Sequence, residues 1–231
     1  MNITLHETLT NKIPNFKIGL IYYSRIVVAQ SPQMIKGRVQ FYQENLFLDL
    51  QNTPVTEREG IKEWRQTLKQ LGSDPNRYRH SAEALMRRIA KAQYLTPIHS
   101  AVDLNNFFSL QYETPVGIYD VAKLNGAITI ALGDENIGYD GLNGRYNTLN
   151  NMPYSSDEIG PFGSLYVDSA RTATGEATTS ALQIFYLQPS LSEEQAKKLL
   201  ESAGNMFTQI SGGDYETALL TVNEPTATLK E

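Results

Sequence analysis

The hydrophobic side chains of this chain follow two different periods, and the change between them near residue 115 limits the folds that are possible. Before that point apolar positions recur every three or four residues, as on one face of an α-helix. After it they form short runs separated by Gly, Asn and Asp clusters, which is typical of β-strands. The expected helices are 34–50, 61–71, 81–89 and 102–110, and the expected strands are 127–132, 164–167, 181–187 and 215–222. The pattern predicts an α+β fold with helices mainly in the N-terminal half and antiparallel or mixed strands mainly in the C-terminal half.

Two segments depart from this order. Residues 16–29 are rich in Ile, Val and Tyr and predict a strand or a bent hairpin arm. Residues 193–207 predict a late helix that is capped by Ser192. Ser81 is the expected N-cap of the third helix, and residues 223–231 form a polar tail that we expect to fray.

No repeat, low-complexity stretch or long linker divides the 231 residues, so we expect a single compact domain over residues 1–222. A chain of this length with 41% hydrophobic residues can bury a sizeable core. Within the domain, residues 1–56 form an N-terminal elaboration of strand and helix, and residues 57–222 form the main body. The polar tail at 223–231 follows it.

Missing residue types exclude several classes of protein. The chain has no cysteine, which excludes disulfide frameworks, thiolate nucleophiles and cysteine-ligated metals. The signatures of nucleotide hydrolysis, dinucleotide redox chemistry, α/β-hydrolases and zincins are also absent. His99 and Asp103 share a helix face, but such a pair is more often a surface hydrogen bond, so we expect no metal and no cofactor. No apolar run is long enough for a membrane span, and we expect a cytoplasmic protein without a membrane partner.

Charge is distributed unevenly along the chain, although the net charge is only −5. Residues 57–91 carry nine basic and five acidic side chains, whereas residues 103–231 carry 6 basic and 17 acidic ones. The basic segment is either a solvated helical surface or a binding surface for phosphate. From charge alone the solvated surface is favoured.

A polar row interrupts the apolar helix expected at 102–110. Asp103, Asn106 and Ser109 are three residues apart, and Asn and Asp are poor interior helix residues because their side chains compete for backbone hydrogen bonds. Two interpretations stay open. The row ties down neighbouring loops, or it lines a pocket for a small ligand.

A second polar segment follows the Gly-Pro-Phe-Gly-Ser sequence at 160–164. Residues 168–176 hold several hydroxyl groups, one carboxylate and the cation Arg171. Arg171 either holds the anionic group of a ligand or neutralises Asp168. The alternatives differ in whether the segment is a binding site.

A series of short motifs appears in a fixed order between residues 61 and 186. They are Trp64-Arg65, 71–75, Tyr78-Arg79, 81–89, Pro97-Ile98, 102–106, Ser109-Leu110, Pro115-Val116, Tyr119-Asp120, 160–164 and 168–174. In this order the chain resembles the tRNA-binding and editing domain (B3/B4) of the phenylalanyl-tRNA synthetase β subunit, and more closely the free-standing bacterial relatives of that domain. The resemblance implies a compact α+β module.

The resemblance also implies a pocket between the 103–109 helix and the 168–174 loop. The implied pocket residues are Asp103, Asn105, Asn106, Ser109, Tyr119, Asp120, Asp168, Ser169, Arg171, Thr172 and Thr174. The implied phosphate contacts, in the basic segment, are Arg79, Arg87, Arg88 and Lys91. No DNA partner is implied.

Two functions follow as alternatives. By resemblance, the protein binds tRNA at its aminoacyl end and acts in trans on a mischarged aminoacyl-tRNA as an ester hydrolase. The alternative is a binding protein or enzyme for a free amino acid or a related small metabolite, without RNA. The family histidine of the motif Pro-x-His-x-x-Asp is replaced by Gly117, and the Gly-Gly-Glu element of the family has no match, so enzymatic activity stays open.

Overall fold

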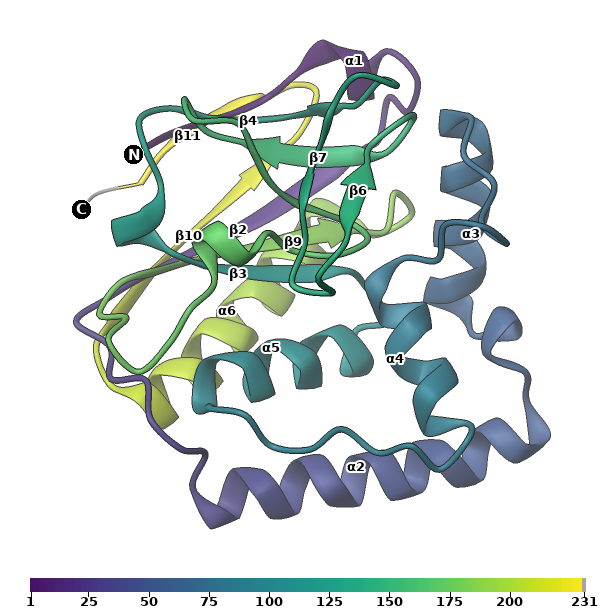
Figure 1. The fold of residues 1–231 in the computed structure, drawn as a ribbon, viewed down its shortest axis with the longest axis vertical. Helices are drawn as coiled ribbons and strands as arrows, with labels where there is room; N and C mark the ends of the chain where they lie inside the picture. Colours follow the sequence, from purple (N-terminus) through teal and green to yellow (C-terminus); the bar gives the residue numbers. More distant parts are fainter. Residues whose placement is uncertain (230–231) are drawn as a thin grey trace.

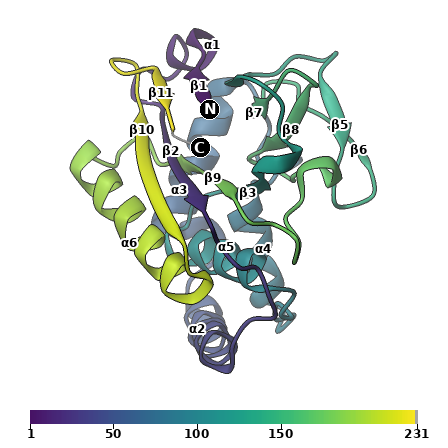
Figure 2. The same cartoon turned by 90° about the vertical axis from the view of Figure 1, so that its left-hand side faces the viewer.

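A computed structural model describes residues 1–229, and in it two β-sheets pack face to face while helices cover the outer side of one of them (Figure 1 and Figure 2). The first sheet contains, in order, β11 (Thr226–Thr228), β1 (Asn2–Leu5), β4 (Ile128–Leu132), β7 (Pro153–Ser156) and β8 (Pro161–Ser164). The second contains β10 (Asp214–Leu220), β2 (Lys17–Ser24), β9 (Ala181–Leu187) and β3 (Val116–Asp120). A separate hairpin consists of β5 (Gly138–Asp140) and β6 (Tyr146–Thr148).

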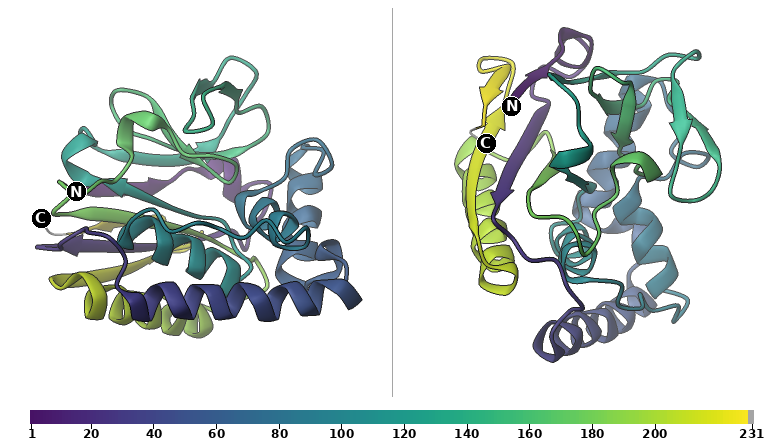
Figure 3. Two further views of the ribbon diagram at one scale, coloured as in Figure 1. Left: turned by 60° about the horizontal axis from the view of Figure 1, so that its bottom comes forward. Right: turned by 60° about the vertical axis from the view of Figure 1, so that its left-hand side comes forward.

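The helices lie mostly on the far side of the second sheet. They are α1 (Glu7–Thr10), α2 (Gln33–Asn52), α3 (Glu59–Leu71), α4 (Ser81–Ile89), α5 (Ser100–Gln111) and α6 (Glu193–Ser211), with single turns η1 (Val55–Glu57), η2 (Val121–Lys123) and η3 (Ala170–Thr172). α5 packs on β3, and α6 packs on β2 and β10. α2 forms an outermost layer beneath them (Figure 3). Among residues 1–229, no helix is long and apolar enough to cross a lipid bilayer.

The second sheet divides the core, because its side chains alternate between two faces. On β9, Leu182 and Ile184 point toward the first sheet and join the core between the sheets. Phe185 and Leu187 point the other way and join the core beneath α5 and α6. Every residue of β9 is buried. Groups that approach β9 from opposite sides are therefore separated by a full layer of side chains.

The expected segregation of elements is confirmed. The mixed α/β fold is a single compact domain in which helices dominate the N-terminal half and strands the C-terminal half. The strand pairs are antiparallel except β1 with β4, which is parallel. The late helix α6 begins with the expected cap, because the Ser192 hydroxyl accepts a hydrogen bond from the N–H of Gln195.

Two local expectations in the middle of the chain are wrong. The N-cap of α4 is His80 and not Ser81, since the imidazole Nδ1 of His80 accepts a hydrogen bond from the N–H of Glu83 at 3.4 Å. The strand expected at 164–167 instead occupies 161–164 as β8. It ends there because the Ser164 hydroxyl accepts hydrogen bonds from the next backbone N–H groups and turns the chain.

Two expectations near the termini are also wrong. The strand β2 ends at Ser24 and does not continue to residue 29, because Arg25 adopts a left-handed conformation with φ 55°. The tail at 223–231 does not fray over its described part: β11 pairs with β1, a strand that the pattern did not predict, and Leu229 is buried. Residues 230–231 lie outside the described part.

Candidate functional site

The polar row on α5 holds neighbouring loops in place. The carboxylate of Asp103 accepts hydrogen bonds from the Ser31 hydroxyl at 2.6 Å and from the N–H of Ile98 at 2.9 Å. The Ser109 hydroxyl donates to the carbonyl of Thr114 at 2.7 Å. These contacts account for both polar side chains as structural ties.

The neighbouring residues Asn105 and Asn106 of α5 face different partners. The amide of Asn105 donates to the carbonyl of Val116 at 2.9 Å, and its oxygen accepts from Gln183 of β9 at 2.8 Å. Asn106 is half-buried and lines, with Asp103, a cavity of about 30 Å³ between α2 and α5. Such a cavity has room for about one water molecule.

The segment 168–174 runs along the free edge of β3, where Ala173 pairs with Tyr119. Asp168 meets Tyr119 on the side of the first sheet, whereas the carbonyl of Thr174 lies 3.3 Å from Nε2 of His99, the N-cap of α5. Val116 and Ile118 of β3 point toward α5, whereas Tyr119 points toward the first sheet and contacts Phe162 at a centroid distance of 4.7 Å. This is the alternation of a pleated strand. Tyr119 and Asp168 therefore lie on the opposite face of the sheet from Asn105 and Ser109 of α5.

A cluster of hydroxyl groups surrounds Asp168 between the two sheets, and we call it the Asp168 cluster. The Tyr119 phenol donates to Oδ1 of Asp168 at 2.6 Å. The Tyr139 phenol donates to the hydroxyl of Ser164 at 2.9 Å. Beside them the hydroxyls of Tyr186 and Ser155 form a hydrogen bond of 2.9 Å. The cluster comprises Tyr119, Tyr139, Ser155, Ser164, Asp168 and Tyr186.

Two glycines make room for the ring of Tyr119. A Cβ atom at Gly117, or one at Gly163, would lie 2.0 Å from the Tyr119 phenol oxygen, which is closer than any real contact. Gly117 is the position at which the resemblance expected a histidine. A side chain there is incompatible with the observed place of Tyr119, so the phenol fills the space that the larger residue would need.

Burial raises the pKa of Asp168 to about 7, although the hydrogen bond from Tyr119 partly opposes this effect. Its carboxyl is surrounded by protein, while the residue as a whole keeps some contact with solvent. Burial also raises the pKa of Tyr119 well above its ordinary value, and the neighbouring carboxyl adds to this. Within residues 1–229, no Lys, Arg or His forms an ion pair with Asp168. Its carboxyl therefore changes its charge close to neutral pH.

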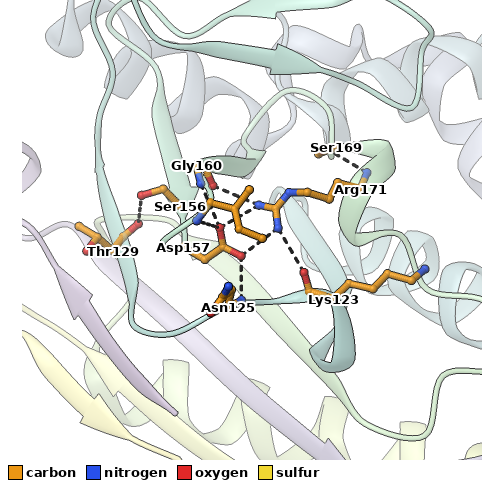
Figure 4. Close-up of polar contacts among 9 residues, drawn as sticks. Lys123, Asn125, Thr129, Ser156, Asp157, Gly160, Ser169 and Arg171 are labelled. Atoms are coloured by element: carbon orange, nitrogen blue, oxygen red, sulfur yellow. Dashed lines mark hydrogen bonds and ion pairs between the residues drawn. The ribbon is translucent and has the colours of Figure 1, made fainter.

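Arg171 does not pair with Asp168, so that expectation is wrong, and its guanidinium is bound by a different carboxylate. Its guanidinium forms two hydrogen bonds of 2.9 Å to the carboxylate of Asp157 (Figure 4). It also donates to the carbonyls of Lys123 and Gly160 at 3.2 Å. The Asp157 side chain is fully buried and that of Arg171 is 28% exposed. The pair fixes three loops to one another.

The remaining predicted residues are caps or unpartnered hydroxyls. Ser169 caps η3, and Asp120 caps η2 while also accepting from the hydroxyl of Thr178 at 2.8 Å. The hydroxyl oxygens of Thr172 and Thr174 are buried and have no hydrogen-bond partner among the described residues. The backbone between them pairs with Tyr119. Two unpaired hydroxyls thus belong to the segment that borders the Asp168 cluster.

Such an arrangement suits the binding of a polar small group. A carboxyl that ionises near pH 7 can bind an ammonium group or take a proton from water. Buried hydroxyls can donate to an oxygen that gains negative charge. In the described conformation, however, the Tyr119 ring occupies the slot beside Asp168, so a ligand has to displace it.

The sequence model of the B3/4 domain matches residues 63–212. The chain belongs to the B3/4 domain family. It is 32% identical to the uncharacterized protein YhzB of Bacillus subtilis (strain 168) over 221 residues, which are 96% of this chain and 100% of that protein. It is 28% identical over 156 residues to the phenylalanine–tRNA ligase beta subunit of Paramagnetospirillum magneticum, which are 57% of this chain and 20% of that subunit.

A crystal structure of an N-terminal fragment of the phenylalanyl-tRNA synthetase beta-subunit from Pyrococcus horikoshii is also similar. It superposes on this B3/4 domain with a TM-score of 0.44 and 12% identity, and covers 93% of this chain and 50% of that fragment.

The basic segment of this B3/4 domain is only partly free. Arg87 donates to the fully buried carboxylate of Glu83 at 2.8 Å, so it is engaged within the fold. Arg79, Arg88 and Lys91 are exposed and form no ion pair within the described part of the chain. Three of the four expected phosphate contacts are therefore unpaired cations.

Sequence reasoning missed most of the Asp168 cluster. Tyr139, Ser155 and Tyr186 belong to no motif, and Ser164 was noted only as the last residue of the Gly-Pro-Phe-Gly-Ser sequence; the four meet because four strands converge. One signal was present: Tyr186 lies at a strand position that alternates with buried apolar residues. A tyrosine in such a position needs a partner for its hydroxyl.

Proposed function

We propose that this B3/4 domain binds tRNA at its aminoacyl end and hydrolyses a mischarged aminoacyl ester in trans. One observation carries the proposal: the segment with the free cations packs directly against the segment that leads to Asp168. The N–H of Ser81 donates to the carbonyl of Leu165 at 2.7 Å, and the rings of Tyr78 and Tyr166 meet edge to face at 6.3 Å. Arg79 adjoins this contact. A phosphate held there lies beside a titratable, hydroxyl-lined interior.

Asp168 then recognises the α-ammonium group of the bound amino acid. Binding of a cation favours the carboxylate, which the protein alone only half maintains at pH 7. Water adds to the ester carbonyl carbon, the bond to the ribose oxygen breaks, and that oxygen leaves with a proton from the water. The unpaired hydroxyls of Thr172 and Thr174 donate to the developing oxyanion. The proposal places the protein in the cytoplasm, where aminoacyl-tRNA is found.

Filter binding of tRNA across a salt series tests the RNA half of the proposal. Charge reversal of Arg79, Arg88 and Lys91 to Glu should weaken binding and reduce the slope of log K against log salt by about 2–3, since each phosphate contact contributes about 0.9. The matched control is Lys197→Glu, which reverses an exposed, unpaired cation on α6. No binding at low salt, or equal loss in both variants, contradicts the proposal.

Deacylation of a panel of aminoacyl-tRNAs tests the chemical half. Asp168→Asn should lower the rate by an order of magnitude or more, because the lost contact to an ammonium group is worth about 1.5–3 kcal/mol. Asp157→Asn is the control, since Asp157 holds Arg171 and not the cluster. If the unmodified protein binds tRNA but deacylates none of the aminoacyl-tRNAs, it is a tRNA-binding protein and the proposed hydrolase activity is wrong.

The acidic remainder of the chain favours a second candidate, a binding protein for a free amino acid or a related metabolite. The 17 acidic and 6 basic side chains of residues 103–231 repel a phosphate backbone but not a small ammonium compound. A thermal-shift screen of free amino acids tests it. Stabilisation that disappears in Asp168→Asn, together with no tRNA binding, selects this candidate.

A further inference from the structure

The loop between α3 and α4 presents two arginines and a tyrosine next to one another, at Arg77, Tyr78 and Arg79. Both arginines are exposed, and neither forms an ion pair within residues 1–229. The Tyr78 side chain is half-buried. Cations interleaved with aromatic rings are typical of surfaces that bind single-stranded nucleic acid, because the cations meet phosphates and the rings stack with bases.

The backbone of this loop is fixed at its start and in its middle. The Ser73 hydroxyl donates to the carbonyl of Asn151 at 3.0 Å. The guanidinium of Arg65 donates to the carbonyl of Pro75 at 3.1 Å and to the side-chain oxygen of Asn76 at 2.6 Å. A loop that is already ordered loses little conformational entropy when a ligand binds to its side chains, which favours tight association.

One face of the Tyr78 ring is open to a planar group. The guanidinium of Arg77 lies over this face, 5.1 Å from the ring centroid. Because Arg77 is exposed, the face that it covers is turned toward solvent. A nucleobase stacks on an aromatic ring more strongly than an exposed guanidinium does, so a base can take its place. The displaced guanidinium is then free to bind a phosphate of the same strand.

The Tyr166 ring connects Tyr78 to the Asp168 cluster. The two rings meet edge to face, with their planes at 78° to each other. The N–H of Tyr166 donates to the hydroxyl of Ser164, a member of the cluster, at 3.2 Å. Asp168 follows two residues later, so the Cα atoms of Tyr166 and Asp168 are at most about 7 Å apart. A nucleotide that stacks on these rings is therefore close to the carboxyl that the proposed function assigns to the ammonium group of the substrate.

We propose that Arg77, Tyr78 and Tyr166 form a stacking platform for an unpaired nucleotide near the 3′ end of tRNA, and that this platform positions the aminoacyl ester at Asp168. The inference rests on the function proposed above and adds the part of the RNA that is recognised, which is the single-stranded end and not the paired acceptor stem. Stacking tolerates every base, so the platform does not select among tRNAs by sequence. Tyr78 and Tyr166 are positioning residues and take no part in the chemical step.

The binding of two RNA hairpins tests the platform. One hairpin reproduces the acceptor stem with its unpaired 3′ nucleotides, and the shortened hairpin lacks them. The unmodified protein should bind the complete hairpin about 10-fold or more tightly. Tyr78→Leu and Tyr166→Leu should lose this preference, whereas Tyr78→Phe and Tyr166→Phe should keep it because the ring remains. Tyr215→Leu, at a half-buried tyrosine of β10, is the matched control and should also keep it.

The outcomes separate this inference from the proposed function. Equal affinity of the unmodified protein for the two hairpins, or a preference that survives in Tyr78→Leu and Tyr166→Leu, overturns the platform and leaves tRNA binding in place. Binding of neither hairpin overturns the proposed function and the platform with it. In the two leucine variants, unchanged affinity for the shortened hairpin shows that the fold is kept.

A fluorescent base gives a measurement that needs no variant. A fluorescent adenine analogue, whose emission falls when it stacks on an aromatic ring, replaces each unpaired nucleotide of the complete hairpin in turn. Binding of the unmodified protein should quench the emission at one of these positions. A bound hairpin whose emission is unchanged at every unpaired position overturns the platform.

Two ester substrates separate positioning from a structural role. Tyr166→Leu should slow deacylation of the aminoacylated complete hairpin about 10-fold, but should leave hydrolysis of the methyl ester of the same amino acid unchanged, since that ester has no base to stack. Asp168→Asn should slow both reactions. An equal loss on both esters in Tyr166→Leu overturns the positioning role. If the unmodified protein hydrolyses neither ester, the proposed hydrolase is wrong, and the two binding measurements still decide the platform.

Arg77→Gln tests the movement of the guanidinium from the ring to a phosphate. For the complete hairpin it should reduce the slope of log K against log salt by about 0.7, which is the contribution of one phosphate of a single strand. For the shortened hairpin the slope should not change. Equal slopes of the variant and the unmodified protein with both RNAs overturn the transfer of Arg77 to a phosphate.

Discussion

Asp157 and Asp168 are eleven residues apart on one segment, and they differ in the groups that donate hydrogen bonds to them. Asp157 is buried against the guanidinium of Arg171 and accepts further bonds from the N–H groups of Asn125 and Gly160. Asp168 is held by a phenol and has no cation. Burial alone would raise the pKa of Asp157, but the bonds from Arg171 and the backbone hold it below its ordinary value. The pKa of Asp168 stays raised.

Glu83 belongs with Asp157, since Arg65 and Arg87 both donate to its fully buried carboxylate. The comparison teaches that a buried carboxylate bonded to a cation holds separate segments of the fold together. A buried carboxyl without a neighbouring cation is only partly ionised near neutral pH. A cationic ligand or a rise in pH can therefore convert it to the charged form.

Removal of the charge of Glu83 should have the largest effect on stability. Glu83→Gln leaves two guanidinium groups without their shared anion and should lower the free energy of unfolding by about 3–5 kcal/mol. Glu194→Gln, which breaks the exposed pair with Lys198, should change it by less than about 0.5 kcal/mol. Urea denaturation measures both. If Glu83→Gln lowered the free energy of unfolding by less than about 1 kcal/mol, the buried pair would contribute no more than an exposed one.

Loss of Arg171 should have the next largest effect. Arg171→Met keeps most of the stem packing but strands the Asp157 carboxylate, so the free energy of unfolding should fall by about 2–3 kcal/mol. The backbone donors to Asp157 limit the loss. Arg145→Met, at an exposed residue without an ion pair in the described chain, is the control. If Arg171→Met kept its stability but lost ligand binding, Arg171 would act in ligand binding and not as a structural partner of Asp157.

Asp168→Asn should change the pH dependence of stability in the opposite direction to the replacement of a carboxylate that is paired with a cation. A carboxyl whose pKa is raised on folding stabilises the protein at low pH, and that contribution is lost as pH rises from about 4 to about 7. The variant should therefore gain about 1–3 kcal/mol relative to the unmodified protein between pH 4 and pH 8, after allowance for partial solvent contact. Thermal and urea unfolding at several pH values measure the gain.

The matched variant for this comparison is Asp157→Asn. The pKa of Asp157 is lowered on folding, so its contribution is present at neutral pH and is lost as pH falls below about 4. The deficit of Asp157→Asn should shrink toward acid pH. Parallel pH profiles for the two variants would contradict the assignment of Asp168 as an uncompensated carboxyl.

Tyr119→Phe should have the smallest effect. It removes the hydrogen bond from the phenol to the carboxyl of Asp168, at a cost of about 1 kcal/mol near neutral pH. Because that bond lowers the pKa of Asp168, its loss should raise the pKa further and move the pH-dependent loss of stability to higher pH. NMR titration of the Asp168 carboxyl measures the shift. A lowered pKa would show that Tyr119 does not act on Asp168 through this bond.

Local patterns predicted most elements of this fold because their causes are local. The three- and four-residue spacing located α2, α3, α4 and α5, and the hydroxyl of Ser192 located the start of α6. The cap of α4 was misplaced by one residue, because a buried imidazole performs the role usually taken by a serine. β1 and β11 were missed because each is short and is stabilised by its neighbours in the sheet.

By itself, the sequence determined the fold class, the family motifs and the chemical types of the candidate groups, since composition and periodicity act within a few residues along the chain. Tertiary structure alone decided which groups meet. It joined Arg171 to Asp157, fourteen residues away, and not to Asp168, three residues away. It also placed Tyr119 and Asp168 on the face of the second sheet that is turned away from α5, while Thr174 reaches the N-cap of α5. Both outcomes depend on which strands from distant parts of the chain become neighbours, and spacing within one strand carries no information about that.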